Sequence, residues 1–403
     1  MKKWNILHRQ EPSRNDLMES MSIPEEIGQI LLNRGVETQD QVKMFTDPSL
    51  KYLRDPFQLK DMDRAVERMR RAISENEKIW IFGDYDVDGV SSASIMILYF
   101  KSIGYPVDYY IPNRLEEGYG LNTEAIDHIA SKDGSLIITV DCGITSVKEV
   151  DYAKDLGIDV IITDHHECQE KLPDAYAVVD PKRDDSSYHF EGICGCGVAF
   201  KLIHALSGNE EFYRNINRYL EIVSLATICD IMPILDENRI IVKNGMEILG
   251  QGNNLGMQAL LEVCGLDGTK IKSSHLGFAI GPRINASGRL GFSKLGVELF
   301  TSDSLEEAKS LALMMDSKNT ERQEVEARIH MEVEDILSKD TSYRDDKVLV
   351  ISGKDWHHGI IGIVASKVTE KYYKPCILLC QDGDMAVGSA RSIKGFDIFS
   401  ALY

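Results

Sequence analysis

Several features that define whole classes of protein are absent from this 403-residue sequence. No apolar run reaches the length of a membrane span, and residues 1–9 carry charge without the apolar stretch that a signal peptide needs. No repetitive or Pro-, Gly- or Ser-rich tract indicates disorder or a solenoid. We therefore expect a folded protein of the cytoplasm.

Positive charge is also scarce, because 45 Lys and Arg stand against 64 Asp and Glu, a net charge of −19. This balance argues against a protein that coats nucleic acid by bulk charge, but it leaves room for a local basic groove. The eight cysteines form no Cys-x-x-Cys pair, and Cys194-Gly-Cys196 has no His at zinc-finger spacing. We expect reduced, partly buried thiols.

What the sequence does contain is a set of closely spaced acids after an apolar run. Residues 78–82 have the character of a buried strand, and Asp84, Asp86 and Asp88 follow at alternate positions. If the backbone stays extended, the three carboxylates share one face and repel one another unless a cation compensates them. A calcium loop is excluded because its twelfth position, which requires Glu, is Ile95. A divalent metal site is predicted, with a solvated acidic turn as the alternative.

Strands and helices alternate after this run. Strands are predicted near 78–84, 107–112, 135–141, 159–164 and 175–180, and helices near 89–103, 122–131 and 145–156. Such alternation predicts an α/β fold with a parallel sheet, whose strand C-terminal ends form the ligand crevice.

The length of the chain predicts more than one domain. Strands return near 347–351, 375–379 and 385–392, with a helix opening after Gly359, which predicts a second, smaller α/β unit. We expect a helical lead-in (1–77), a catalytic domain (78–240), its helical extension (241–303), a connector helix (304–339) and the smaller unit (340–403).

Further polar clusters follow other predicted elements directly. Asp141 follows one strand, Asp164, His165 and His166 follow the next, and Asp230 ends an apolar helix. Taken singly, they could be a helix cap, surface loop residues and a helix-end acid. Converging in one crevice, they would give the mixed oxygen and nitrogen ligand set that suits Mn²⁺ or Mg²⁺. Two such ions can clamp an in-line phosphoryl displacement.

The order and spacing of these residues resemble the motifs of the DHH phosphoesterase superfamily, in Gly83-Asp-Tyr-Asp-Val-Asp-Gly89, Asp141-Cys-Gly143, Asp164-His-His166 and Asp230. Within it, Gly281-Pro-Arg-Ile-Asn-Ala-Ser-Gly-Arg289 and Trp356-His-His-Gly-Ile-Ile-Gly-Ile-Val-Ala365 are similar to the RecJ family. The resemblance covers most of the chain and implies a DHH domain joined by a connector helix to a DHHA1-like domain. RecJ proteins usually continue with a Gly-Gly-His-containing end and an OB-fold, and we expect this chain to lack both, leaving the second domain incomplete.

The resemblance implies a 5′-to-3′ exonuclease that acts on single-stranded DNA and releases 5′-mononucleotides with two Mn²⁺ or Mg²⁺ ions, in recombination and repair. It also implies a single-strand-binding protein and a helicase as partners. Carried over by position, it implies five metal ligands, with Asp141 bridging the ions: Asp84, Asp86, Asp141, His165 and Asp230. Asp164 would orient the imidazoles, and His166 would face the scissile phosphate. For Asp88, a ligand role and an orienting role both stay open.

The same resemblance implies two groups of substrate contacts. Arg114, Ser389 and Arg391 would clamp the 5′-phosphate, and four further residues would line the strand path: Arg283, Arg289, His357 and Gly359. Arginine suits this task because its guanidinium matches phosphate geometry bidentately. For Arg283 and Arg289, ion pairs with the acidic surface are the alternative.

Two other functions stay open. One is a DHH phosphodiesterase for oligoribonucleotides or cyclic dinucleotides, which the acidic balance and the missing OB-fold favour, whereas the connector helix and Gly281–Arg289 favour the exonuclease. The other is a non-catalytic relative that binds strands, which should have lost ligands, although every ligand position here is filled. A Ser/His/Asp hydrolase is disfavoured because no Gly-x-Ser-x-Gly elbow follows a strand.

Overall fold

The computed structural model describes residues 23–114, 117–383 and 385–402, so the start of the predicted lead-in lies outside the described residues. Its main sheet is fully parallel, with the order β2-β1-β3-β4-β5. The strands are β1 (Ile79–Gly83), β2 (Asp108–Tyr110), β3 (Leu136–Val140), β4 (Asp159–Thr163) and β5 (Ala177–Val179). The predicted α/β fold with a parallel sheet is confirmed.

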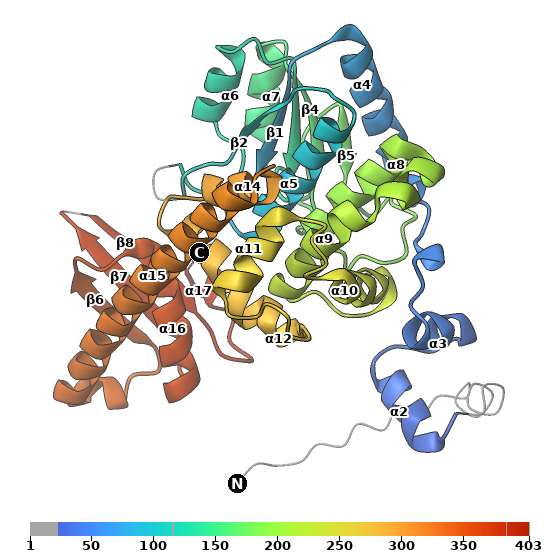
Figure 1. The fold of residues 1–403 in the computed structure, drawn as a ribbon. Coiled ribbons are helices and arrows are strands. Elements are labelled where there is room, and N and C mark those ends of the chain that lie inside the picture. The colour runs from blue at the N-terminus through green and yellow to red at the C-terminus, as the bar shows by residue number, and fades with distance from the viewer. Residues whose placement is uncertain (1–22, 115–116, 384, 403) are drawn as a thin grey trace.

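Helices cover both faces of this sheet (Figure 1). Along β1, Ile79 and Ile81 belong to one buried cluster and Trp80 and Phe82 to another, because successive side chains of a strand point to opposite faces. One cluster contains residues of α6 (Thr123–Ala130) and α7 (Val147–Asp155). The other contains residues of α4 (Met62–Glu75), α5 (Val87–Ser102), α8 (Gly195–Asn215) and α9 (Asn217–Cys229).

Further helices precede and follow these elements. Several of them add buried residues to the cluster of Ile79 and Ile81, whereas the buried residues of 31–42 form a small cluster of their own. On the N-terminal side the structure has α2 (Glu25–Asn33), α3 (Gln39–Thr46), η1 (Leu50–Tyr52) and η2 (Pro56–Gln58). After α9 come α10 (Asp236–Ile248), α11 (Leu255–Val263), α12 (Ser273–His275), the π-helix η3 (Leu276–Ile280), α13 (Gly281–Arg289) and α14 (Lys294–Thr301). From α10 to α14 the chain is thus helical, as predicted for the segment after residue 240.

One long helix, α15 (Leu305–Lys339), connects two hydrophobic cores. In its first half Ala312 and Met315 are buried in the core of the main sheet, whereas Ile329 and Val333 are buried in the core of a second sheet. Figure 1 shows α15 running from beside α14 to that second sheet. The helix predicted over 304–339 is therefore present, while the domain boundaries stay a prediction.

The second, smaller sheet has the order β6-β7-β8, with β6 and β7 parallel and β8 antiparallel. Its elements are η4 (Thr341–Arg344), β6 (Leu349–Lys354), α16 (His358–Tyr372), β7 (Cys376–Asp382), β8 (Met385–Arg391) and α17 (Ile398–Leu402). The second α/β unit is thus confirmed. None of the eight cysteines forms a disulfide. Among the described residues, no helix has the length and apolarity needed to span a bilayer.

Candidate metal centre and flanking arginines

The loop after β1 carries the first three acids, and it does not stay extended. Asp86 is the N-cap of α5 and accepts hydrogen bonds from the backbone N–H of Asp88 (2.8 Å) and Gly89 (3.1 Å). A Cβ on Gly89 would lie 2.5 Å from the carbonyl oxygen of Asp84, so the close packing of helix on loop requires glycine. The expectation that Asp88 continues an extended face is therefore wrong, because the helix begins before it.

Asp88 instead faces the start of α8. Its two carboxylate oxygens accept hydrogen bonds from the backbone N–H of Gly195 (2.7 Å) and Cys196 (2.8 Å). The side chain is buried, and burial raises its pKa to about 6. Since both oxygens already have partners, this geometry favours the orienting role over the ligand role.

Asp164, at the end of β4, orients the residues that follow it. It accepts hydrogen bonds from the backbone N–H of Ile144 (2.9 Å) and His165 (2.7 Å), and its Oδ1 lies 2.7 Å from Nδ1 of His166. Burial alone would raise the pKa of Asp164, but the hydrogen bond with His166 and its positive charge hold it below its usual range. The same hydrogen bond raises the pKa of His166 to about 8. The Nδ1 proton of His166 is thereby directed to Asp164, which leaves Nε2 for other contacts.

The remaining acids converge on His165. Its Nε2 lies 3.2 Å from Oδ1 of Asp141 and 3.7 Å from Oδ2 of both Asp88 and Asp230. The potential ligand atoms form three overlapping groups, each with all atoms within 4.8 Å of one another: Asp84, Asp86 and Asp141; Asp88, His165 and Asp230; Asp141, His165 and His166. The structure therefore brings all five predicted metal ligands together at the C-terminal ends of the strands.

The state of these carboxylates fits a metal centre. Among the described residues, Oδ1 of Asp84, Oδ1 of Asp141 and Oδ2 of Asp230 are buried polar atoms without a hydrogen-bond partner. Burial, reinforced by the neighbouring carboxylates, raises the pKa of Asp84 and Asp141 well above the usual range. Buried acceptors of like charge are costly unless a cation compensates them. Oxygen ligands with one imidazole match the preferences of Mn²⁺ and Mg²⁺.

A group of arginines lies beside this centre. The Arg114 guanidinium lies 4.9 Å from the ring centre of Tyr85, the residue between the first two acids. Burial and the nearby charges of Arg114, Arg322 and Arg391 together lower the pKa of Arg289 to about 10. Within the described part of the chain, Arg114, Arg289 and Arg391 make no ion pair. Unpaired guanidinium groups so close together in an acidic protein are typical of an anion site.

Most of the other predicted substrate residues meet at the junction with the smaller unit. Nη1 of Arg289 donates to the carbonyl oxygen of Gly359 (3.0 Å), and a Cβ on Gly359 would lie 2.7 Å from the carbonyl oxygen of Arg289. His357 is the N-cap of α16. On β8, Nη1 of Arg391 donates to Oγ of Ser389 (3.2 Å). Residues of both units thus meet at this junction.

Arg283 does not join this group. Its Nε donates to Oδ1 of Asp316 (2.9 Å) and its Nη1 to the carbonyl oxygen of Ala279 (2.6 Å). The ion pair that the sequence left as an alternative is what the structure contains. Arg283 thus ties α13 to α15, and its role as a substrate contact stays a prediction.

Two further residues lie at the site, and the sequence motifs do not single them out. Tyr119, which is 49% exposed, has its hydroxyl 3.3 Å from Nδ1 of His166 and its ring edge-on to Tyr85. Asp180 follows β5 directly, as the predicted acids follow β3 and β4, so its position could have revealed it. It is buried, burial raises its pKa to about 7, and its Oδ2 has no hydrogen-bond partner among the described residues.

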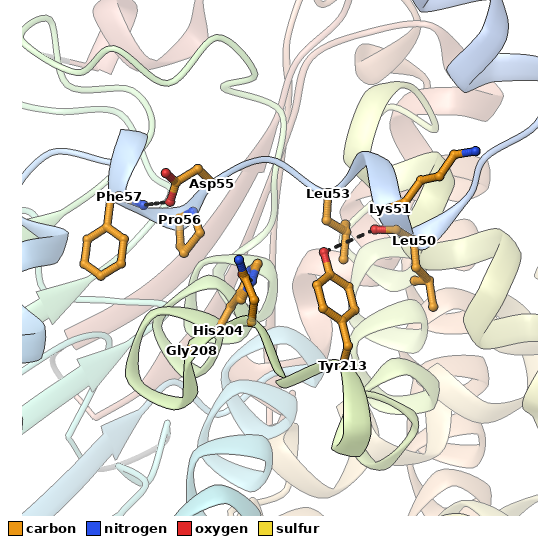
Figure 2. A pocket seen from close by; sticks show the side chains of 10 residues that line it. Leu50, Lys51, Leu53, Asp55, Pro56, Phe57, His204, Gly208 and Tyr213 are labelled. Atoms are coloured by element: carbon orange, nitrogen blue, oxygen red, sulfur yellow. Dashed lines mark hydrogen bonds between the residues drawn. The ribbon is translucent and has the colours of Figure 1, made fainter. Parts of the chain in front are cut away.

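A cavity of about 700 Å³ lies away from these acids, between residues 50–57 and α8 (Figure 2). The Tyr213 hydroxyl donates to the carbonyl oxygen of Leu50 across it (3.4 Å). The buried His204 ring pairs with Asn209, 2.7 Å from Nε2 to Oδ1. None of the predicted site residues lines this cavity.

Comparison with known proteins defines the class first. Residues 78–227 match the family model described as "DHH family, N-terminal domain". This segment holds the main sheet and all of the acids except Asp230. The segment thus has the fold of a DHH domain.

Full-length relatives narrow the class to one family. The chain is 39% identical over 402 residues to the single-stranded-DNA-specific exonuclease RecJ of Bacillus subtilis, covering 99% of this chain and 50% of that protein. It is 36% identical over 411 residues to RecJ of Escherichia coli, covering 96% of this chain and 70% of that protein. The chain therefore belongs to the RecJ family. It spans half the length of the first relative.

Solved structures agree with this assignment. A crystal structure of an exonuclease RecJ bound to manganese is 31% identical, with a TM-score of 0.74 over 85% of each chain. RecJ of Thermus thermophilus in complex with Mn²⁺ is 28% identical, with a TM-score of 0.78 over 97% of this chain and 55% of that one. Both relatives bind the class of metal that the donor atoms here would suit.

Proposed function

We propose that this protein hydrolyses single-stranded DNA from the 5′ end and releases 5′-mononucleotides, with two divalent ions, Mn²⁺ or Mg²⁺. The observation that carries this proposal is the position of unpaired arginines directly beside the acidic centre. Arg114 stacks on Tyr85, and the electrostatic influence of Arg114 reaches Asp84. An anion site next to a metal centre is what an enzyme needs to hold a terminal phosphate and cut the neighbouring bond.

The arginines would recognise the strand end. Arg114, Ser389 and Arg391 would bind the terminal 5′-phosphate, and Arg289, His357 and Gly359 would border the adjoining backbone. These residues come from both α/β units, so the site is complete only where the units meet. Because a clamp on the terminal phosphate fixes its distance to the metal centre, it would limit the product to one nucleotide.

The acids and imidazoles would perform the chemistry. Asp84, Asp86, Asp141, His165 and Asp230 would hold two divalent ions, which lower the pKa of bound water and neutralise charge on the phosphate. Asp88 and Asp164 would hold these ligands in place through their backbone hydrogen bonds. His166, whose pKa is raised to about 8, keeps its proton near neutral pH and would donate from Nε2 to a phosphate oxygen.

The biological setting is part of the proposal. Single-stranded DNA would reach the enzyme in recombination and repair, in the cytoplasm. A helicase would expose the strand, and a single-strand-binding protein would hold it extended. The acidic surface of the chain, with its net charge of −19, supports strand capture at a local basic site rather than by bulk charge.

The test is a Mn²⁺-supplemented digestion of a 5′-phosphorylated single-stranded DNA of about twenty nucleotides and of a diadenylate, with Asp84→Asn protein as the control. We expect stepwise release of mononucleotides from the long strand, lost in the variant. A strand with a 5′-hydroxyl should be cut more slowly, because it offers no terminal phosphate to Arg114 and Arg391. Cleavage of the diadenylate alone would instead assign a small-substrate phosphodiesterase, and inertness on both would indicate a binding protein.

A further inference from the structure

The helix that delivers Asp230 ends in an unusual way. At the end of α9, the backbone N–H of Met232 donates to the carbonyl oxygen of Thr227 (3.2 Å) and that of Ile231 to Ile228 (3.2 Å). This is the Schellman pattern, which places one residue in the left-handed conformation, usually glycine. Here the residue is Ile231, with φ 58°. A β-branched side chain is strained at such an angle.

Ile231 is also 88% exposed, so no core contact offsets that strain. A second apolar side chain emerges from the neighbouring segment, because Phe278 in the π-helix η3 is 86% exposed. The two segments are packed together, since Sγ of Cys229 donates to the carbonyl oxygen of Leu276 (3.6 Å). A Cβ on Gly281 would overlap the same sulfur atom. Both exposed side chains therefore flank the end of α9, where Asp230 enters the metal centre.

The helix α13 runs from this junction to the arginine group. Its first residue, Gly281, packs on Cys229, and its last, Arg289, is in the arginine group. Between them, Oδ1 of Asn285 accepts from the backbone N–H of Val87 (3.3 Å), which places the middle of α13 beside the loop of acids. Nine helical residues span about 12 Å. A strand held by the arginines and lying along α13 would thus pass the metal centre and reach Ile231 and Phe278.

We propose that Ile231 and Phe278 form an apolar platform for the bases of the substrate strand on the 3′ side of the scissile phosphate. This proposal adds a base-binding surface to the proposed function and rests on that function for the direction of the strand. An aromatic ring and a branched aliphatic side chain suit any base, because every base has an apolar face, so contact there is independent of sequence. A strained side chain that is exposed beside the acidic centre is an outlier that a ligand contact would account for.

The test pairs protein variants with altered strands. Wild type, Ile231→Gly and Phe278→Ala are assayed on a 5′-phosphorylated strand of about twenty nucleotides and on the same strand with abasic residues at its second to fourth positions. For the wild type we expect the abasic strand to raise KM about tenfold. In each variant, KM for the normal strand should be higher than in the wild type by a similar factor. Replacing the normal strand by the abasic strand should then change KM of the variant little. Variants that keep the wild-type ratio of KM between the two strands would overturn the platform.

Thermal unfolding separates this role from loss of the fold. Ile231→Gly should keep or raise Tm, by about 1–2 °C, because glycine relieves the left-handed strain. Tyr373, at the C-terminus of α16, is the matched control, since its φ is 51° and it is 67% exposed. Tyr373→Gly should change Tm in the same direction without changing KM. A KM effect of equal size in Tyr373→Gly would also overturn the platform.

Binding distinguishes failure of this inference from failure of the proposed function. The Kd of both fluorescent strands is measured with Ca²⁺ in place of Mn²⁺, so that affinity is read without cleavage. If the wild type cuts neither strand, the exonuclease proposal fails. The platform then stands if Kd shows the same coupling between variants and abasic residues, and it is overturned if Kd does not.

Discussion

Two groups of buried charges lie in the main α/β unit, and they are built in opposite ways. In one, Nζ of Lys201 lies 2.8 Å from Oε1 of Glu237, and both side chains are fully buried. Glu237 also accepts from the backbone N–H of Arg54 (2.8 Å), whose guanidinium pairs with Asp236 (2.6 Å). Each buried charge here has a partner of opposite sign from the protein itself.

The acidic centre lacks that balance. Asp84 and Asp86 group with Asp141, and Asp141 and Asp230 lie beside the imidazole of His165. Several of these buried oxygens have no hydrogen-bond partner among the described residues. Burial of like charge costs free energy that the fold does not recover internally. The two groups therefore differ in a way that distinguishes buried charges with a structural role from those with a functional role. A paired buried charge completes the fold, whereas an unpaired cluster indicates a ligand that the fold is built to receive.

Among the substitutions that distinguish the two groups of buried charges, we expect one at Asp141 to change the activity most. Asp141→Asn should reduce kcat with Mn²⁺ by about 10³-fold or more, because it removes the carboxylate shared by two of the ligand groups. The same change should leave Tm in EDTA unchanged or higher, because one repelling carboxylate is gone. Activity assays and thermal unfolding check the two halves. A variant that melts well below the wild type would show that Asp141 is structural.

The opposite result is expected for Glu237. Glu237→Ala should lower the free energy of unfolding by about 3–5 kcal/mol, because Lys201 is left buried without its partner, while kcat of the folded protein stays unchanged. Denaturant titration measures the first effect. The double variant Lys201→Met and Glu237→Leu is the control, and it should recover most of the loss. A lower kcat in folded Glu237→Ala protein would show that this paired charge is functional as well as structural.

The sequence predicts those parts of the fold and the site that depend on residues close together in the chain, and it does not predict those that depend on residues far apart. The strands and the acids after them follow from local alternation, which is why the sequence predicts that Asp141, Asp164 and His165 follow strand ends. The orienting role of Asp88 depends on backbone N–H groups at 195 and 196, far away in the chain. The pair of Lys201 and Glu237 also depends on tertiary packing. No local pattern carries such contacts.

The next largest change in stability is expected from metal binding. Mn²⁺ at about 100 times its Kd should stabilise the wild type by about 2.7 kcal/mol, because the ion binds the folded state alone. Asp141→Asn should lose most of this stabilisation, whereas Glu237→Ala should keep it despite its lower baseline. Thermal unfolding across a Mn²⁺ series, with EDTA as the zero point, measures the difference. Equal stabilisation of the two variants would place the ion elsewhere.

The smallest effect tests a third kind of buried charge. Glu221 is 1% exposed, its carboxylate accepts a long hydrogen bond from the neutral amide of Asn253 (3.4 Å), and burial raises its pKa to about 7 from an ordinary 4.5. The folded carboxyl thus keeps its proton where the unfolded one has lost it. Its contribution to stability is full below about pH 4.5 and is lost as pH rises to about 7.

Glu221→Gln should abolish that dependence, because the amide cannot ionise. Between pH 5 and pH 7 the stability of the variant relative to the wild type should therefore rise by about 2 kcal/mol. Urea titrations at a series of pH values, in EDTA to remove the contribution of metal, measure the difference. Parallel pH profiles would show that water or a rearranged partner stabilises the ionised carboxylate. A buried acid would then need neither a counter-charge nor a metal, and the contrast between the two groups would lose its force.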